Sequence, residues 1–374
     1  MSKVTLGQVA TEVRESTKDP AGLPIVGLEH LIPGEIRLTQ WSETSENTFT
    51  KLFHKGQVLF GRRRAYQKKA AVADFDGVCS GDITVIAAKP DRLLPDLLPF
   101  IVNDDRFFDF AMEKSAGSLS PRVKWAQLAE YAFDLPDDIE EQRSHAKLLW
   151  AIERNRSAYQ NLLSQMDELV KSQFVEMFEG RQDAAYQTLE DCCVSVSGGS
   201  TPSMKHEEYY GGDIPFIKSG DVKTDYVSSG ALWLTQKALE ETASKLIPKG
   251  TVIVVTRSGI LKHDLPVAIT STPVVINQDI KAFEPKPEFT SQYIAWAIRS
   301  RQDALLSKTR AMTVDNIESK ELFEIPVMVA SATEQERFSR FVVQTDKSKY
   351  YCQHQTIFRN VAQQVTTLNR SMIH

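Results

Sequence analysis

Short β-like runs of apolar residues alternate with longer helical repeats along this chain. Within residues 3–135, runs rich in Val, Ile and Phe are broken by Gly, Asp or Pro, which is typical of strands. These strands are predicted at Leu23–Gly27, Gln57–Phe60, Ala70–Ala73 and Ile83–Ala87. Apolar residues at helical spacing then predict a helix between Leu93 and Lys114. Mixed strands and helices in one globule indicate an α/β or α+β domain.

The same order of elements returns in residues 187–327. Strands are predicted near Ile214–Lys218, Thr251–Thr256, Val267–Ile269 and Ile280–Phe283. A helix from about Thr290 to Leu306 follows them. We therefore expect a second globule of the same class.

A long charged stretch with narrow apolar spacing follows each globule. The first stretch carries Leu148, Ile152, Tyr159, Leu162, Met166 and Leu169, and the second carries Val343, Tyr350, Ile357, Val361 and Leu368. Such stripes are seams for another helix. Each stretch has about 40 residues at 1.5 Å, which makes a rod of roughly 60 Å. We expect the two rods to pack on each other as an antiparallel coiled coil.

Short sequence matches relate the two halves of the chain. Thr5-Leu6 matches Thr188-Leu189, Lys55-Gly56 matches Lys249-Gly250, and Asp82-Ile83 matches Asp279-Ile280. Leu135-Pro136 before Glu140-Glu141-Gln142 matches Ile325-Pro326 before Glu334-Gln335-Glu336. The separations drift from 183 to 194, 197 and 193, as loop insertions between shared elements produce. We predict pseudo-symmetric globules at 1–135 and 181–327, a central helix at 136–180 and a distal helix at 328–374.

Composition adds limited information to this pattern. The net charge of −5 argues mildly against nucleic acid, although local clusters of Lys and Arg matter more than the average. The chain has no long apolar run and no signal-like start, so a cytoplasmic location is expected. Cys79, Cys192, Cys193 and Cys352 form no metal-ligand spacing, which predicts neither a zinc site nor a disulfide framework. Adjacent Cys192 and Cys193 are interpreted as buried, reduced residues.

A family resemblance lies in the second globule. Ser197-Gly198-Gly199-Ser200-Thr201-Pro202 precedes Tyr209-Tyr210-Gly211-Gly212-Asp213-Ile214-Pro215-Phe216-Ile217-Lys218-Ser219-Gly220-Asp221. This pattern resembles the target recognition domain of the specificity subunit of type I restriction-modification systems. That family has a Gly-Gly-Thr-Pro segment, here with one extra Ser, and a Trp where Phe216 stands. The Glu-Glu-Gln openings of both long stretches are similar to its spacer helices, whereas the first globule lacks the Gly-Gly-Thr-Pro segment.

The resemblance implies a subunit that reads DNA and catalyses nothing itself. Each recognition domain would read one half of a bipartite DNA site. The paired helices would set the spacer and dock methyltransferase subunits, two in number, that carry S-adenosylmethionine. Restriction/translocase subunits with ATP and Mg would join in a defence against foreign DNA. No amino-methylation motif, Gly-rich cofactor loop or Walker loop is present in the sequence. The alternatives are a coiled-coil protein-interaction scaffold and, less favoured, an enzyme with an unrecognised site.

The strongest DNA-contact candidates are two basic loops at matching positions. The first joins two predicted strands and contains Arg62, Arg63, Arg64, Tyr66, Gln67, Lys68 and Lys69. Arg can bridge guanine O6 and N7, and Gln can bridge adenine N6 and N7. The matching loop contains Arg257, Ser258, Lys262 and His263. Arg62 or Arg63, together with Arg257, are the single residues we favour, and a solvated hairpin tip is the alternative.

A second matched pair follows the predicted helix of each globule. It contains Ser118, Ser120 and Arg122 in the first copy and Arg310, Thr313 and Asn316 in the second. Small hydroxyls and cations suit phosphate contacts, and helix capping explains them equally well. Lys218 and Ser219, just past a strand, are further candidates for DNA contact. The Gly198–Pro202 segment is interpreted as a turn rather than a phosphate site.

Overall fold

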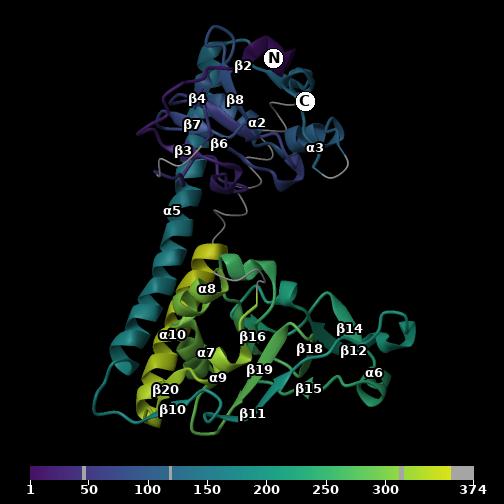
Figure 1. Cartoon of the computed structure of the whole chain (residues 1–374), viewed down its shortest axis with the longest axis vertical. Coiled ribbons are helices and arrows are strands. Elements are labelled where there is room, and N and C mark those ends of the chain that lie inside the picture. Colours follow the sequence, from purple (N-terminus) through teal and green to yellow (C-terminus); the bar gives the residue numbers. More distant parts are fainter. Residues whose placement is uncertain (44–47, 118–119, 311–315, 355–374) are drawn as a thin grey trace. The chain divides into compact units, whose positions relative to one another are not determined.

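The computed structural model describes residues 1–43, 48–117, 120–310 and 316–354 of the chain. These residues fall into two compact units, Met1–Gln160 and Asn161–Gln353 (Figure 1). The boundary lies inside one continuous helix, α5 (Ile139–Phe178). We call the two parts unit 1 and unit 2 and describe each by itself.

The described part of unit 1 contains three small sheets. An antiparallel pair joins β1 (Ser2–Thr5) and β9 (Ala132–Leu135). An antiparallel sheet has the order β2 (Ala10–Val13), β8 (Ile83–Ala88), β5 (Val58–Gly61) and β6 (Ala70–Val72). The third has the order β3 (Ile25–Val26), β7 (Gly77–Cys79) and β4 (Lys51–Phe53). Short helices α1 (Leu6–Val9) and α4 (Trp125–Leu128) complete the ends of the unit.

The helix predicted at Leu93–Lys114 is wrong as a single element. It is a 3₁₀ turn, η3 (Pro95–Leu97), followed by α2 (Leu98–Val102) and α3 (Asp105–Glu113). The break is at Asp104, whose backbone is extended (φ −69°, ψ 138°) and whose carboxylate accepts from the Arg106 N–H at 2.9 Å. An aspartate N-cap begins a new helix and explains the interruption. Phe107 and Phe108 on α3 still pack against Phe60 of the sheet, as the apolar spacing requires.

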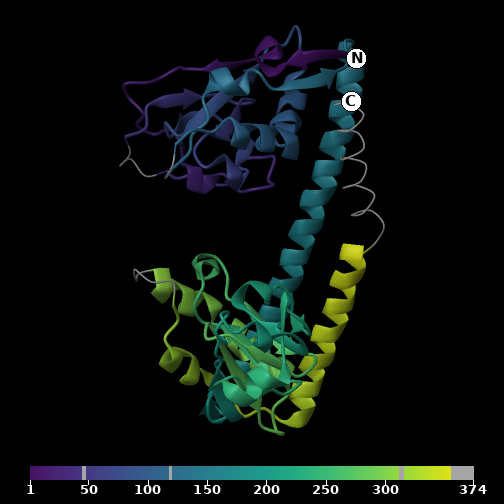
Figure 2. The same ribbon diagram turned by 90° about the vertical axis from the view of Figure 1, so that its right-hand side faces the viewer.

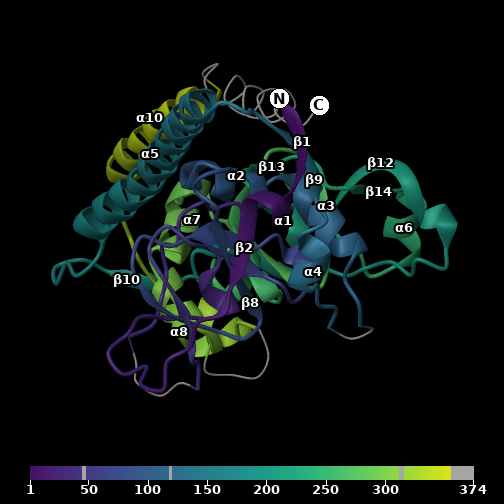
Figure 3. The ribbon, with the colours of Figure 1, turned by 90° about the horizontal axis from the view of Figure 1, so that it is seen from above.

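The described part of unit 2 also contains three sheets. An antiparallel pair joins β10 (Tyr186–Thr188) and β20 (Pro326–Met328). A five-stranded sheet has the order β11 (Cys193–Gly198), β19 (Ile280–Pro285), β16 (Val252–Val255), β17 (Val267–Thr270) and β13 (Tyr226–Val227). The last has the order β14 (Leu232–Leu234), β12 (Tyr210–Ile217), β18 (Val274–Ile276) and β15 (Leu246–Ile247). This last sheet and α6 (Gln236–Glu241) lie on the side of unit 2 away from α10 (Ala332–His354) (Figures 1 and 3).

The predicted helix at Thr290–Leu306 is also two helices, α7 (Ser291–Arg299) and α8 (Gln302–Arg310). The chain turns at Ser300–Arg301 between them. Tyr293 and Ile298 of α7 are fully buried, so the apolar face that the sequence indicated is present. A short α9 (Ser319–Phe323) leads into β20.

The internal repeat predicted from sequence is a repeat of structure. In unit 1 the antiparallel order β2-β8-β5-β6 corresponds to β11-β19-β16-β17 in unit 2. A parallel pair, β3-β7 in unit 1 and β12-β18 in unit 2, forms part of a second sheet in each. Gly56 and Gly250 both adopt left-handed φ, 85° and 84°, before the equivalent strands β5 and β16. The mixed α/β fold class is therefore confirmed.

One glutamine in each long helix makes the same three hydrogen bonds. The Gln142 side chain accepts from the Leu94 N–H and donates to the carbonyls of Arg92 and Pro136. The Gln335 side chain accepts from the Thr290 N–H and donates to the carbonyls of Glu288 and Ala330. Ala330 is thus the counterpart of Pro136, so the predicted match of Pro136 with Pro326 is wrong. Pro326 instead lies in β20, opposite Thr188, as Ala132 lies opposite Thr5.

Helix α10 packs antiparallel to the C-terminal part of α5 within unit 2 (Figure 2). Phe338 contacts Phe174 and Phe178 near one end of α10, and Lys349 pairs with Asp167 toward the other. Both helices open with acidic first turns, as the sequence indicated, and the Glu334 carboxylate accepts from the Ser331 N–H at 3.0 Å. Acidic groups there complement the positive end of the helix dipole.

The predicted seam residues are largely not the buried ones. Leu148, Leu162, Leu169 and Val343 are exposed. Ile152 of the predicted seam is buried, where it joins Ala146 and Leu149 in unit 1, and the buried stripe in unit 2 is Val170, Phe174 and Phe178. The reason is that α5 packs on the globular core of each unit, which selects a different helix face from a two-helix seam. Ile357, Val361 and Leu368 lie outside the described residues.

Candidate nucleic-acid interface

The loop between β5 and β6 holds the first basic segment in a constrained conformation. A 3₁₀ turn, η2 (Ala65–Gln67), is flanked by Arg64 and Lys68, both left-handed with φ of 56° and 51°. A residue other than glycine pays roughly 1–2 kcal/mol for this conformation. The Arg64 N–H donates to the Pro121 carbonyl at 2.9 Å, and the Gly61 N–H donates to the Lys69 carbonyl at 2.9 Å. Such over-determined, unfavourable backbone is a feature of functional loops.

The carboxylate of Asp82 contacts an arginine from each of the two predicted segments of the first globule. Asp82 accepts from Arg122 Nε at 2.8 Å and lies 3.3 Å from Arg63 Nη1. Arg63 Nε also donates to Ser120 Oγ at 2.6 Å, and Arg63 forms a backbone bridge with Arg122. The hydrogen bond from Arg122 is the main reason that the pKa of Asp82 is lowered. The two segments predicted separately in the first globule therefore contact each other and the same carboxylate.

The remaining side chains of the first loop divide into engaged and unengaged groups. Lys68 pairs with Asp105 at 2.5 Å, and Lys69 Nζ donates to the Leu28 carbonyl at 2.7 Å. Burial lowers the pKa of Lys69. Among the described residues, the exposed side chains of Arg64 and Tyr66 form no ion pair or side-chain hydrogen bond. Gln67 is half-buried, and the Nε of half-buried Arg62 has no hydrogen-bond partner among these residues.

Unit 2 repeats this arrangement with different side chains. Arg257 binds Asp279 through Nη2 at 2.7 Å and Nε at 2.8 Å, and Asp279 also accepts from Asn277 Nδ2 at 3.1 Å. Arg257 forms a backbone bridge with Asn316, as Arg63 does with Arg122. The pairs Arg63–Asp82 and Arg257–Asp279 are therefore equivalent, and we call each an Arg–Asp station. Asn316 occupies the position of Arg122, so the second station has one cation fewer.

Three further predicted residues surround the second station. Ser258 precedes the 3₁₀ turn η6 (Gly259–Lys262), and Lys262 and His263 are exposed at its end. Leu261 is fully buried and fixes this turn on the core. The matched loops therefore occupy equivalent places, at the end of β5 in unit 1 and of β16 in unit 2.

The segment after β12 also reaches this region. The Asn277 N–H donates to the Ile217 carbonyl at 3.0 Å, which sets Lys218 and Ser219 beside the strand end that leads to Asp279. The Lys218 N–H donates to an Asp221 carboxylate oxygen at 2.9 Å. Among the described residues, the ammonium group of Lys218 forms no ion pair. Lys218 is thus a cation held near the second station by its backbone.

The Gly198–Pro202 segment serves packing instead of the predicted turn. A Cβ at Gly199 would lie 2.1 Å from the Ile276 carbonyl oxygen, so only glycine fits. The Ser200 N–H donates to the same carbonyl at 3.2 Å. Phe216, at the position of the family's Trp, is fully buried beside Leu234 and Val275. Both motif features build the core that carries Lys218 and Asp279.

Some predicted residues cannot be placed, and two important ones were not predicted. Ser118 and Thr313 lie outside the described residues, as does the side chain of Arg310. Asp82 and Asp279 were used only as markers of the repeat. Both copies of the repeat have an aspartate at this position, next to loops rich in Lys and Arg. This signal could have identified the two aspartates as partners of arginine.

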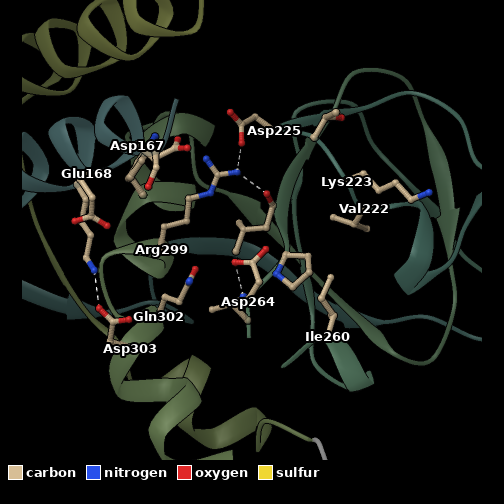
Figure 4. Close-up of a pocket in the computed structure, with 17 residues that line it drawn as sticks. Asp167, Glu168, Val222, Lys223, Asp225, Ile260, Asp264, Arg299, Gln302 and Asp303 are labelled. Carbon is tan, nitrogen blue, oxygen red and sulfur yellow. Dashed lines mark hydrogen bonds and ion pairs between the residues drawn. The ribbon is translucent and has the colours of Figure 1, made fainter. Parts of the chain in front are cut away.

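A separate hollow of about 670 Å³ in unit 2 is occupied at its edges by internal ion pairs (Figure 4). Arg299 binds Asp225 at 2.6 Å and the Val267 carbonyl at 2.6 Å, and Lys171 binds Asp303 at 2.6 Å. None of the candidate DNA-contact residues lines it. These pairs tie α7 to β17 and to the loop before β13, and they tie α5 to α8, so we assign the hollow a structural role.

The described residues contain no His, Cys, Asp and Glu group that could hold a metal ion. Cys79, Cys192 and Cys193 are buried free thiols, and the sequence predicted the burial of Cys192 and Cys193. Burial raises the pKa of Cys192 to about 11 and that of Cys79 and Cys193 to about 12. In the described part of the chain, no helix combines the length and apolarity needed to cross a membrane.

Comparison with known proteins supports the resemblance. Residues 182–356 match the model of the type I restriction modification DNA specificity domain. The chain is 30% identical over 189 residues to the specificity subunit of the type I restriction enzyme EcoR124I/EcoR124II from Escherichia coli, covering 50% of this chain and 46% of that protein. It is 32% identical over 149 residues to the MjaIX specificity subunit from Methanocaldococcus jannaschii, covering 38% and 34%. The matched part thus spans less than half the length of these relatives.

A solved structure extends the likeness of fold to the whole chain. The S subunit of a type I restriction-modification system from M. genitalium superposes with a TM-score of 0.54 and 13% identity, covering 100% of this chain and 96% of that one. At this identity the comparison concerns the fold alone. Residues 182–356 of this chain are thus similar to the type I restriction modification DNA specificity domain, and the chain is similar in part of its sequence to specificity subunits of type I restriction enzymes.

Proposed function

We propose that this chain is the DNA sequence-specificity subunit of a type I restriction-modification complex. Each recognition domain, at 1–135 and 181–327, reads one half of a bipartite DNA site. The helices at 136–180 and 328–374 set the spacer between the halves and dock methyltransferase subunits. The chain contributes recognition, and its partners contribute the chemistry.

The observation that carries this proposal is the duplicated Arg–Asp station. Both copies hold an arginine on a carboxylate at the same strand end, Arg63 on Asp82 and Arg257 on Asp279. A guanidinium held in one orientation loses less conformational entropy when it binds a base edge bidentately. One of the two stations lies in the part of the chain that matches a DNA specificity domain.

The surroundings of the two stations support different base preferences. The first loop carries Arg62, Arg64, Lys68 and Lys69 in addition to Arg63, whereas the second carries Lys262 and His263 in addition to Arg257. Arg122 in unit 1 is replaced by Asn316 in unit 2, and arginine and asparagine favour guanine and adenine respectively. Two unlike surfaces on a repeated scaffold suit two unlike half-sites.

The partners supply the cofactors in this proposal. Two methyltransferase subunits bring S-adenosylmethionine, and restriction/translocase subunits bring ATP and Mg. The chain works in the cytoplasm, where the DNA and these partners are found.

A binding experiment on the full chain with its methyltransferase subunits tests the proposal. Fluorescence anisotropy with methylation-mapped and scrambled duplexes, titrated from low to high salt, should show specific binding and a linear loss of log affinity with log salt. Exchanging residues 187–327 for those of a relative should change one half-site only. Equal affinity for all duplexes, or none for any, would favour a protein-interaction scaffold.

A further inference from the structure

The two long helices carry equivalent stripes in which a central apolar residue lies between cations. Gln142 and Gln335 fix the register because they make the same hydrogen bonds, 193 positions apart. In this register Lys147, Trp150 and Arg154 of α5 correspond to Arg340, Val343 and Lys347 of α10. Steps of three and four residues place each set on one helix face. We call these sets the α5 stripe and the α10 stripe.

Each stripe borders a hollow in its own unit. The α5 stripe lines a cavity of about 480 Å³ together with Arg37, Lys55 and Arg143. The α10 stripe lines a hollow of about 450 Å³ with Ser339 and Gln344. The helix residues around the two hollows therefore occupy matching positions in the repeat, although no sequence motif marked them.

The cations of both stripes are available for an external partner. Among the described residues, Lys147, Arg154, Arg340 and Lys347 form no ion pair, and all four are exposed. Arg37 and Lys55 are likewise exposed and without an ion pair in the described part of the chain. The α5 hollow is lined by five cationic side chains and two carboxylates, those of Asp74 and Asp96, whereas the whole chain has a net charge of −5. This local excess of positive charge calls for an anionic occupant.

The apolar centre of the α5 hollow is rigid. The guanidinium of Arg37 lies 4.3 Å from the centre of the Trp150 ring, and Phe100 meets the same ring edge-on at 4.9 Å. The Trp150 Nε1–H donates to the Asp96 carbonyl at 3.0 Å. Buried Val72, Ala73 and Ala146 form the rest of the floor. In the α10 stripe the central Val343 is 39% exposed. Each stripe thus offers an apolar contact between charges of one sign.

This chemistry fits an acidic protein segment better than DNA. The α5 hollow adjoins Lys55–Gly56 before β5 and Ala73–Asp74 after β6, at the opposite end of that hairpin from the Arg62–Lys69 loop. A phosphate backbone has no apolar group to place on Trp150, whereas an acidic protein segment can place an apolar side chain there between its carboxylates. The chain's own residues 355–374 contain no Asp or Glu, so they lack the complementary charge.

We infer that the α5 stripe and the α10 stripe each receive the same acidic protein segment, one with an apolar side chain between carboxylates, from two copies of one partner. Only the identification of this partner as the methyltransferase subunit rests on the proposed function. Exposed cations around a preorganised apolar centre are the features of a protein-binding hot spot with a polar rim.

Photo-cross-linking tests the inference on the full chain co-expressed with its methyltransferase subunit. Benzoylphenylalanine replaces Trp150 in one variant and Val343 in another, and exposed Leu148 of α5, which is not in the stripe, serves as the control position. Positions 150 and 343 should label one and the same partner segment, rich in Asp and Glu, and position 148 should not. Labelling of two different segments, or of DNA, would overturn the inference.

Charge reversal gives a second readout that does not depend on Trp150. Native mass spectrometry should show one partner copy fewer with Lys147→Glu/Arg154→Glu, and one fewer with Arg340→Glu/Lys347→Glu. The charge-matched control Lys3→Glu/Lys18→Glu, at exposed positions away from both stripes, should retain all copies. If both stripe variants keep the wild-type number of partner copies, the inference about the stripes is rejected. The proposed function is not rejected by that result, because the wild-type chain still binds the partner. A wild-type chain that binds no methyltransferase subunit rejects the proposed function as well.

Discussion

Replacing the arginine of each station should have unequal effects, because the carboxylates differ in their other partners. Arg257→Ala leaves the Asp279 side chain with the neutral Asn277 amide as its one partner among the described residues, whereas Arg63→Ala leaves Asp82 bound to Arg122 at 2.8 Å. Loss of a base-reading arginine costs about 1–3 kcal/mol on the cognate site. An uncompensated carboxylate about 8 Å from a phosphate adds about 1 kcal/mol at an effective dielectric constant near 40. We therefore expect Arg257→Ala to weaken cognate binding about five-fold more than Arg63→Ala, since 1.4 kcal/mol is a factor of ten.

The double variant Arg257→Ala/Asp279→Asn provides the control for this reasoning. It removes the unpaired carboxylate and should recover the additional loss while leaving the loss of base reading. Anisotropy titrations on the cognate duplex and on duplexes altered in one half-site measure both the additional electrostatic loss and the loss of base reading. A contact with a base should relax specificity at one position, whereas a contact with phosphate alone should flatten the salt slope by about one unit for every sequence. Equal losses for the two arginine variants, or no recovery by Asp279→Asn, would refute the electrostatic argument.

Three further predictions concern the scaffold. Gln142→Ala and Gln335→Ala should each lower the free energy of unfolding by about 2–4 kcal/mol, since each leaves one buried and two partly buried hydrogen bonds to the backbone unmade, and a surface Gln236→Ala should change denaturant midpoints little. The pKa of His54 is raised by hydrogen bonds to Asp76 and, to a smaller extent, Glu15. The small contribution of His54 to stability should therefore be complete below about pH 6.5 and should fade as the pH rises through the higher pKa of the folded state. A His54→Gln variant should lose this pH dependence in thermal melts, and an unchanged profile would contradict the prediction. A four-residue insertion after Leu162 lengthens α5 by about 6 Å and turns it by about 40°, so methylation mapping on a spacer library should show a preferred spacer longer by one or two base pairs, unlike the same insertion in the loop after Lys205.

The sequence predicted the repeat because its signals are local and occur twice. Gly56 and Gly250 require a left-handed backbone, and Gln142 and Gln335 satisfy the same backbone groups. Such positions leave few alternatives to their residue type, so they match even where overall identity is low. The predicted match of Pro136 with Pro326 was wrong because proline is compatible with more than one place in the repeat. Pro326 lies in β20, whereas Pro136 lies in the segment that leads into α5.

The buried faces of the long helices could not be predicted, because the spacing of apolar residues does not show whether a stripe packs on another helix or on a globular core. Leu148, Leu162 and Leu169 have seam spacing and are exposed, while Phe174 and Phe178 pack on the core of unit 2. The interruption at Asp104 was hidden by apolar residues on both sides of it. In each case tertiary packing or a single capping group outweighed the hydrophobic pattern.

The candidate interface divides into positions that both copies keep and positions that differ. Both copies keep the aspartate at the strand end, the arginine that it binds and the backbone bridge beside it. The residue across that bridge changes from Arg122 to Asn316, and Arg62 gives way to Thr256, whose N–H donates to Asp279 as that of Arg62 donates to Asp82. The kept residues hold the loops in place, and the changed residues set the donors and acceptors that the loops present. A scaffold built in this way can acquire a new target by substitution at a few loop positions without altering its core, which is the property that a subunit reading two unlike half-sites requires.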